Sequence, residues 1–194
     1  MNNYEYIIAC LPVLDRDADH PGALDADAVI GEIRERLDAS DAAVLDFMLQ
    51  GYDNETLGEE FYSRALRHGS RFIREYFTLD LNVRNTKVEY LNRALGREPG
   101  KDLLVLPGRE DIDFELKPEV EAILSGTDIL QKERGLDDIM WAGAEELTIM
   151  EVFSLDAILG FVARLKIIDR WLKLDPETGR EMFRKLVEQI RNNR

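Results

Sequence analysis

Apolar residues recur at helical spacing along most of the chain, and residues 70–95 carry the clearest run. Placed at about 100° per residue, this run has one broad apolar face and one polar face. The apolar face holds Phe72, Ile73, Tyr76, Phe77, Leu79, Val83, Val88, Tyr90 and Leu91. The polar face holds Arg71, Arg74, Glu75, Asn82, Asn85, Glu89, Asn92 and Arg93. The pattern predicts an amphipathic helix that stops at Gly96.

Shorter helices are expected before this run. They cover residues 4–11, 25–37, 40–50 and 55–66. The first of them is apolar at nearly every position, which also fits a short buried strand, and we favour a helix. Asp25 or Asp27 is expected to cap the second helix and Ser40 the third, because their side-chain oxygens can accept from the N–H groups of a first turn. Gly51 fits the end of the third helix.

Residues 96–118 are the least helical part of the chain. They contain Pro99, Gly100, Pro107 and Gly108, a candidate extended piece at 103–106 and an acidic run at 110–115. After them, helices are expected at 118–124, 127–140, 142–174 and 176–191. Strand signals are almost absent, so the predicted fold class is all-α, with two packed helical lobes. Their boundaries are 1–106 and 107–194, and one continuous domain is the alternative.

Four charged residues fall where apolar ones are expected. Asp80, Arg84 and Lys87 lie near the middle of the apolar face of 70–95, and Arg164 lies among apolar residues of 142–174. An isolated buried ion costs several kcal/mol, so these charges should be paired, and Asp80 and Arg84 are spaced i,i+4. We expect a partly buried polar network, with Arg164 in it or in a partner contact. The simpler interpretation is paired structural charges whose stems pack on the core.

A short internal repeat relates two parts of the chain. Phe-Thr-Leu-Asp at 77–80 recurs as Phe-Ser-Leu-Asp at 153–156. Thr78 and Ser154 are candidates to restart a helix, and the Asp two residues later would lie near its positive end. If the repeat reflects structure, it indicates two related helical lobes.

Composition narrows the classes of partner. The 194 residues include 39 acidic and 25 basic side chains, a formal charge of −14, with 45% hydrophobic and 33% charged residues. This balance is typical of a globular chain, and it argues against binding to nucleic acid or to an anionic membrane. Residues 147–174 are interrupted by charges well before the ~20 apolar residues of a membrane span. With no basic leader visible, we expect a cytoplasmic protein with no direct membrane insertion.

Few residues are available for catalysis or metal binding. The chain has one cysteine, Cys10, which we expect to be a buried inert thiol, and two histidines, His20 and His68. Asp15, Asp17 and Asp19 are spaced as in a calcium loop, but His20 and Ala26 replace its required Gly and Glu. The neighbouring carboxylates Asp137–Asp138 and Glu145–Glu146 point different ways around a helix and are expected to be solvated or capping. We therefore expect no catalytic, metal or cofactor site.

Three segments resemble a known family. They are YEYIIACLP at 4–12, FIREYFTLDLNVRN at 72–85 and KIIDRWLKLDPETG at 166–179. They resemble a bacterial family of unknown function encoded among V-type (archaeal-type) ATPase genes. That family is distantly similar to the C subunit of the rotary ATPase, called the d subunit in eukaryotes, whose helical lobes repeat an Asp followed by Asn and basic residues. Asp80, Asn82, Arg84 and Asn85 match this pattern best.

The resemblance implies a non-catalytic role. The C subunit is a helical socket between the central stalk and the membrane ring, so this chain would be a peripheral subunit or assembly factor, held on the inner membrane face by protein contacts. The C subunit has three lobes, whereas this chain has room for about two at ~100 residues each, which implies a reduced or accessory form. The structural or interaction residues would be Asp80, Asn82, Arg84, Asn85, Lys87 and Arg164.

Two other functions remain open from the sequence. One is a free-standing helical adapter that binds a protein unrelated to the ATPase. The other is an acid–base or metal-dependent enzyme centred on Asp80, Arg84 and Lys87, for which no nucleophile or metal set is evident. Mutual pairing of these three charges away from any pocket would argue against the enzyme.

Overall fold

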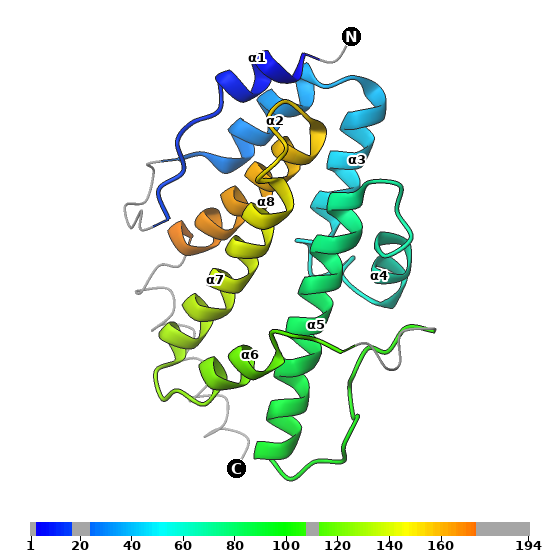
Figure 1. Ribbon diagram of the computed structural model, residues 1–194, viewed down its shortest axis with the longest axis vertical. Coiled ribbons are helices and arrows are strands. Elements are labelled where there is room, and N and C mark those ends of the chain that lie inside the picture. Colours follow the sequence, from blue (N-terminus) through cyan, green and yellow to red (C-terminus); the bar gives the residue numbers. More distant parts are fainter. Residues whose placement is uncertain (1–2, 17–23, 108–112, 174–194) are drawn as a thin grey trace, which may run out of the picture.

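The computed structural model describes residues 3–16, 24–107 and 113–173 of the chain. Within these ranges the fold consists of eight α-helices and no strand (Figure 1). The helices are α1 (Tyr4–Ala9), α2 (Ala26–Arg36), α3 (Ala39–Gln50), α4 (Glu59–Ala65), α5 (Arg71–Ala94), α6 (Lys117–Leu124), α7 (Ile129–Thr148) and α8 (Leu155–Leu172). The prediction of an all-helical fold is confirmed. The helix expected at 176–191 lies outside the described residues, and so do Asp17, Asp19 and His20.

The helix starts are set by side-chain caps. Ser70 Oγ accepts from the N–H of Ile73 at 3.3 Å and begins α5, and Asp25 caps α2 as expected. The expectation that Ser40 caps α3 is wrong. The extended backbone of Asp38 places its Oδ1 over the first turn, where it accepts from Ser40 and from Asp41 at 3.0 Å each.

The start of α4 is also later than expected. Residues 53–57 form a turn in which Leu57 N–H donates to Asp53 O at 2.9 Å and Thr56 Oγ1 donates to Gln50 O at 2.5 Å. These bonds satisfy the backbone outside a helix, so α4 begins at Glu59 rather than Glu55.

The break in the last part of the chain lies at 149–154 instead of 141. α7 continues through Gly143 because that glycine is packed: a Cβ there would collide with the side chain of Leu79 on α5. α8 begins at Leu155, where Ser154 Oγ accepts from the N–H of Ala157 at 3.2 Å. The prediction that Ser154 starts a helix is confirmed, and the single helix 142–174 is wrong.

The internal repeat has no structural counterpart. Thr78 lies inside α5, and its hydroxyl donates to Arg74 O at 2.7 Å, so it starts no helix. Asp80 is therefore in mid-helix, whereas Asp156 lies in the first turn of α8. The four matched residues occupy unlike positions and do not define related lobes.

The helices pack in layers around α5 and α8. In Figure 1, α5 and α7 run side by side, with α6 across their lower ends. α8 packs against α7, and its other sides contact α1, α2, α3 and α5. Ile158, Leu159, Val162 and Leu165 of α8 are fully buried, and one apolar core joins the elements on both sides of residue 106. No helix in the described ranges is both long and apolar enough to cross a bilayer.

Part of the polar face of α5 is covered instead of solvated. Asn92, expected on the wet face, is buried, and its Nδ2 donates to Lys101 O at 2.7 Å. Asn85 donates to Leu104 O at 2.9 Å and accepts from Leu104 N–H at 3.1 Å. The segment that follows α5 thus runs back along the helix as irregular chain, held by side-chain amides. The polar positions here therefore carry side chains that bind backbone groups and not side chains that face solvent.

Candidate interaction surface

The charged residues on the apolar face of α5 are paired. Arg84 Nε donates to Asp80 Oδ2 at 2.8 Å, which confirms the expected i,i+4 pair, and the Tyr62 hydroxyl donates to the same oxygen. Burial raises the pKa of Tyr62, and the negative charge of Asp80 raises it further, so the phenol stays a hydrogen-bond donor. Asp80 is thus satisfied from two helices.

Lys87 and Arg164 do not join this pair. Lys87 Nζ binds Glu133 Oε1 of α7 at 2.6 Å. Arg164 binds Glu145 Oε1 and Gly160 O at 3.2 Å each, with its guanidinium 5.5 Å from the centre of the Trp141 ring. In place of one network, the predicted residues form separate pairs that hold α5 to α4 and α7, and α7 to α8. No ion pair joins these pairs to one another within the described part of the chain.

Asn82 and Asn85 line a small polar hollow between α5, residues 103–106 and α6. Its volume is about 240 Å³. The Glu89–Lys117 ion pair, at 2.6 Å, lies on its wall. The Asn85 amide that lines this hollow binds the backbone of Leu104, so it attaches the returning segment, residues 101–106, to α5.

The residues with potential chemistry lie apart. His68 stacks on Phe47 with ring centres 4.9 Å apart, and its Nδ1 accepts from Ser70 N–H at 3.1 Å. Burial lowers the pKa of His68, with Arg74 and Arg64 adding to the effect. Cys10 is exposed at the end of α1, so the expectation of a buried thiol is wrong. The described residues contain no group of three His, Cys, Asp or Glu that could hold a metal ion.

Asp137 is a structural residue that the sequence interpretation missed. Expected to be solvated or capping, it is 8% exposed, and its Oδ2 accepts from Arg170 and, at 2.6 Å, from Trp171 Nε1. Burial raises the pKa of Asp137, and this outweighs the opposing effect of Arg170. The signal was available in the sequence: on one continuous helix from 129 to 148, Asp137 shares a face with Met140, Trp141 and Ala144.

The connection between α7 and α8 presents a row of apolar side chains to solvent. Ile149, Met150, Val152 and Phe153 are between 54% and 85% exposed. We call residues 149–153 the apolar turn. Single exposed hydrophobic residues are ordinary on protein surfaces, but four within five residues concentrate apolar surface in one turn, as binding sites do.

The apolar turn is anchored to the start of α5. Arg71 Nη2 donates to Leu147 O at 2.7 Å and lies 3.5 Å from Glu151 Oε1, while its Nε lies 3.8 Å from Asp156 Oδ2. Ser70 Oγ donates to Asp156 Oδ1 at 3.4 Å. Polar contacts at both ends therefore hold the turn in place while its apolar side chains stay exposed.

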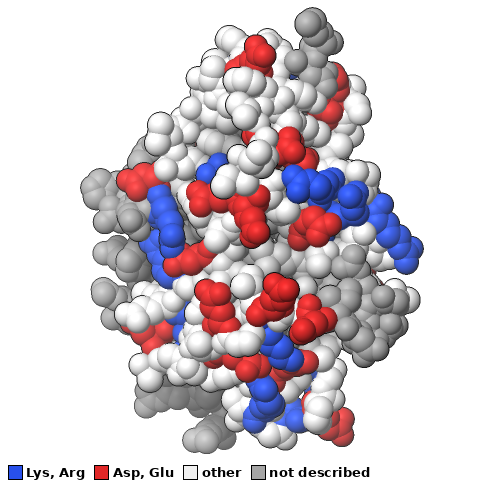
Figure 2. All heavy atoms as spheres, viewed as in Figure 1, with Lys and Arg blue, Asp and Glu red and all other residues white. Residues whose placement is uncertain are grey.

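A groove of about 580 Å³ lies beside this anchor, between α5, α6 and α7. Its floor is apolar and consists of Leu79, Leu116, Ile139, Ala142, Gly143 and Leu147. Its rim carries Arg71 and four carboxylates, Glu75, Glu119, Asp138 and Glu146. Figure 2 shows acidic side chains on either side of a paler strip near the middle of this face. We call this feature the acidic groove.

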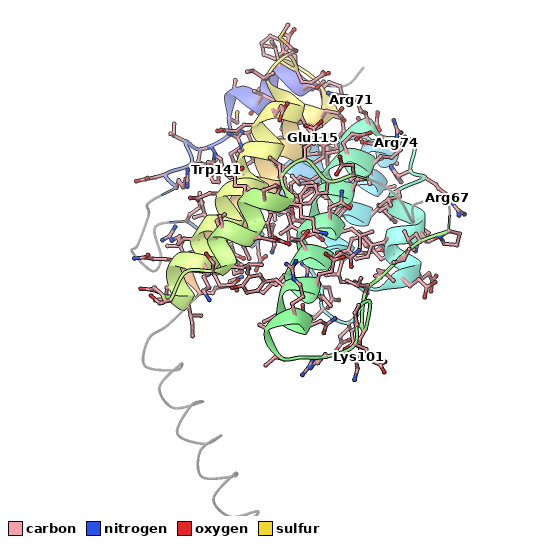
Figure 3. The ribbon with its side chains drawn as sticks, turned by 60° about the horizontal axis from the view of Figure 1, so that its bottom comes forward. Arg67, Arg71, Arg74, Lys101, Glu115 and Trp141 are labelled. Atoms are coloured by element: carbon pink, nitrogen blue, oxygen red, sulfur yellow. The ribbon has the colours of Figure 1, made fainter. Side chains whose placement is uncertain are left out.

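The apolar turn and the acidic groove are adjacent. Arg71 and Leu147 line the groove, and the hydrogen bond between them also anchors the turn. Figure 3 shows Arg71 at the end of the molecule that carries the α7–α8 connection, and Glu115 on the segment that leads into α6. The site residues predicted from the sequence lie elsewhere. The four charged ones pair within α5 or between helices, and Asn82 and Asn85 line the hollow beside residues 103–106.

Comparison with known proteins identifies the family but adds no relative. No curated protein and no solved structure shows a significant match. The model of the family described as protein of unknown function, DUF2764, matches residues 55–194, which include the apolar turn and the acidic groove. With more than half of its length matched, the chain belongs to the DUF2764 family of proteins of unknown function.

Proposed function

We propose that this protein is a non-catalytic peripheral subunit or assembly factor of a V-type rotary ATPase, which docks on the machine through the apolar turn. The observation that carries the proposal is the exposure of Ile149, Met150, Val152 and Phe153 on a turn held by Arg71. Covering such a side chain completely contributes about 1.5–3 kcal/mol, so a protein partner would gain stable binding from this patch.

The identity of the partner rests on the sequence resemblance. The segment 72–85, with Asp80, Asn82, Arg84 and Asn85, is the part most similar to the helical lobes of the C subunit. By that resemblance the partners are the proteins of the central stalk and the membrane ring, and this protein couples one to the other or helps them assemble. It would then sit in the cytoplasm on the inner membrane face, through protein contacts alone.

A role without catalysis fits the contacts of the charged residues. Asp80 and Arg84 bind each other, and Lys87 binds Glu133, so the three charges of the enzyme hypothesis are already engaged in ion pairs. Among the described residues that line the acidic groove and the hollow beside Asn85, none is one of these three. This favours a structural use of these charges over acid–base work.

Co-purification from the native host tests the proposal. The tagged full chain, isolated in mild detergent, is expected to bring down stalk and ring proteins of the ATPase. The double variant M150S/F153S should reduce their recovery by about tenfold or more, because two apolar contacts are lost. The control V13S/L95S removes two exposed apolar side chains from elsewhere on the surface and should change nothing.

Two results would overturn the proposal. One is the absence of stalk and ring proteins from the wild-type preparation, whether or not an unrelated protein is captured. The other is equal recovery with M150S/F153S and with the control, provided that both variants unfold at the wild-type temperature.

A further inference from the structure

We infer that the acidic groove binds a basic amphipathic helix of the partner protein. This inference rests on the proposed function in one respect, that the protein works by binding another protein, and it specifies the chemistry of what binds. It concerns a different part of the surface from the apolar turn, so it can be tested separately.

The floor of the groove suits the apolar face of a helix. α5 and α7 approach closely because Leu79 packs against the bare backbone of Gly143. Ala142 of α7, which also lines the groove, is exposed, and its small side chain leaves the floor open at that point. Shallow apolar grooves between packed helices commonly receive an amphipathic helix, whose apolar residues lie along the floor.

The rim of the groove selects a basic occupant. Glu75, Glu119 and Glu146 form no ion pair with any described residue, although each lies on the rim. Asp138 is paired with Arg16, and Arg71 is engaged by Glu151 and Asp156. Within the part of the chain that the structure describes, the groove thus keeps three unpaired carboxylates, contributed by α5, α6 and α7, around an apolar floor.

Other classes of occupant fit less well. Nucleic acid and anionic lipid carry phosphates, which three carboxylates would repel. A second copy of this chain has the same charge of −14, so two copies repel each other overall. A helix with lysine or arginine on one face and leucine-like residues on the other complements both the rim and the floor.

A synthetic peptide tests the groove directly. The probe is a helix of about 18 residues with leucine on one face and lysine on the other, and the comparison peptide has glutamate in place of lysine. Fluorescence anisotropy measures the binding of each peptide to the full-length protein. We expect the lysine peptide to bind, with an affinity that falls as salt is raised, and the glutamate peptide not to bind.

Matched variants separate the groove from net charge. The triple variant E75Q/E119Q/E146Q should weaken binding of the lysine peptide by about tenfold, as expected for three partly screened charge contacts. The control E35Q/E55Q/E98Q removes the same charge from exposed sites outside the groove and should change affinity by less than about twofold. A142Q, which adds a polar side chain to the floor, should also weaken binding.

Several outcomes would overturn the inference. Equal weakening by the two triple variants would mean that only net charge matters, and equal binding of both peptides would mean that charge does not. A photo-crosslinker at position 142 that reacts in the free protein with residues 174–194, or with a second copy, would assign the groove to the chain itself.

The two proposals fail in different ways. If the lysine peptide binds as expected but no stalk or ring protein of the ATPase is recovered, the proposed function fails and the groove assignment stands. If those ATPase proteins are recovered and the peptide result is negative, the groove assignment fails alone.

Discussion

Removal of the Asp137 side chain should destabilise the fold, because it leaves one hydrogen-bond donor without an acceptor. Asp137 is buried between α7 and α8 and accepts from Arg170 and Trp171. The Arg170 side chain is half exposed, so water can replace its bond to Asp137. The Trp171 indole N–H is the group that loses its partner when Asp137 is replaced by alanine.

The size of the effect follows from these two environments. A buried donor without an acceptor costs about 1–3 kcal/mol, and Trp171 is only partly buried, so its N–H falls in the lower part of that range. The lost bond to the half-exposed arginine adds less than about 1 kcal/mol. Asp137→Ala should therefore lower the free energy of unfolding by about 2 kcal/mol. Asp137→Asn keeps an oxygen for Trp171 and removes a buried charge, so its cost should be only about 1 kcal/mol.

Solution pH should also separate wild type from Asp137→Asn. The pKa of Asp137 is raised in the native state, above the ordinary 3.8, so the native state holds the proton more tightly than the unfolded chain. The stabilising contribution is present at low pH and is lost as pH rises through the native pKa. Wild type should therefore gain stability relative to the asparagine variant as pH falls towards 4.

Urea unfolding followed by circular dichroism measures these differences. Asp138→Ala is the matched control, because the neighbouring carboxylate pairs with Arg16 and both partners are half exposed; its cost should be below about 1 kcal/mol. A double-mutant cycle with Arg170→Met should give a coupling below about 1 kcal/mol. An Asp137→Asn cost equal to that of Asp137→Ala would refute the role of Trp171 as the group that loses its partner. So would an Asp137→Ala cost no larger than that of the control.

Two further predictions concern the returning segment and His68. Asn85→Ala removes both hydrogen bonds to Leu104, so it should lower the free energy of unfolding by about 1–2 kcal/mol and speed amide hydrogen exchange at Leu104. Asn82→Ala is the control. Equal exchange rates at Leu104 in both variants would contradict the role of Asn85. The native pKa of His68 lies below the ordinary 6.5. The neutral imidazole therefore contributes its full stability above pH 6.5, and this contribution declines as pH falls through the native pKa. The slope of the free energy of unfolding should be below about 1.4 kcal/mol per pH unit. Urea midpoints between pH 5 and 7.5 should show a weaker slope for His68→Asn, and identical slopes would rule this out.

Helix α5 shows what the sequence predicts well. Ser70 supplies a cap at one end and Gly96, with φ at 63°, follows the other, so local signals place the helix to within a residue. The pairing of Asp80 with Arg84 is equally local, because i,i+4 spacing on one helix brings the two side chains together. Features decided within one helical turn are the ones that sequence patterns identify.

The break between α7 and α8 depends on contacts that the sequence does not show. The break expected at 141 is absent, and α7 runs on through Gly143, on which Leu79 of another helix packs. Ile149 to Phe153 continue the apolar pattern, so a helical wheel treats them as core. Their exposure follows only from the direction in which the chain leaves Thr148.

On the polar face of α5, the sequence pattern wrongly predicts contact with solvent at Asn85 and Asn92. Asn85 and Asn92 have the spacing of solvated residues, but the chain returns over them and uses their amides as partners for its backbone. An irregular segment must satisfy its peptide groups somewhere, and asparagine can donate and accept at once. Spacing alone cannot distinguish water from backbone as the partner.

The anchor of the apolar turn explains why exposure there is a fixed property and not a consequence of loose packing. The Arg71 side chain is about half exposed, so each of its ion pairs contributes at most about 1 kcal/mol. The hydrogen bond to Leu147 O and the Ser154 cap act on the two ends of the same turn. Because several weak contacts converge from α5, α7 and α8, loss of one leaves the others in place. The apolar side chains are thereby presented outward by the fold itself, as a preformed binding surface requires.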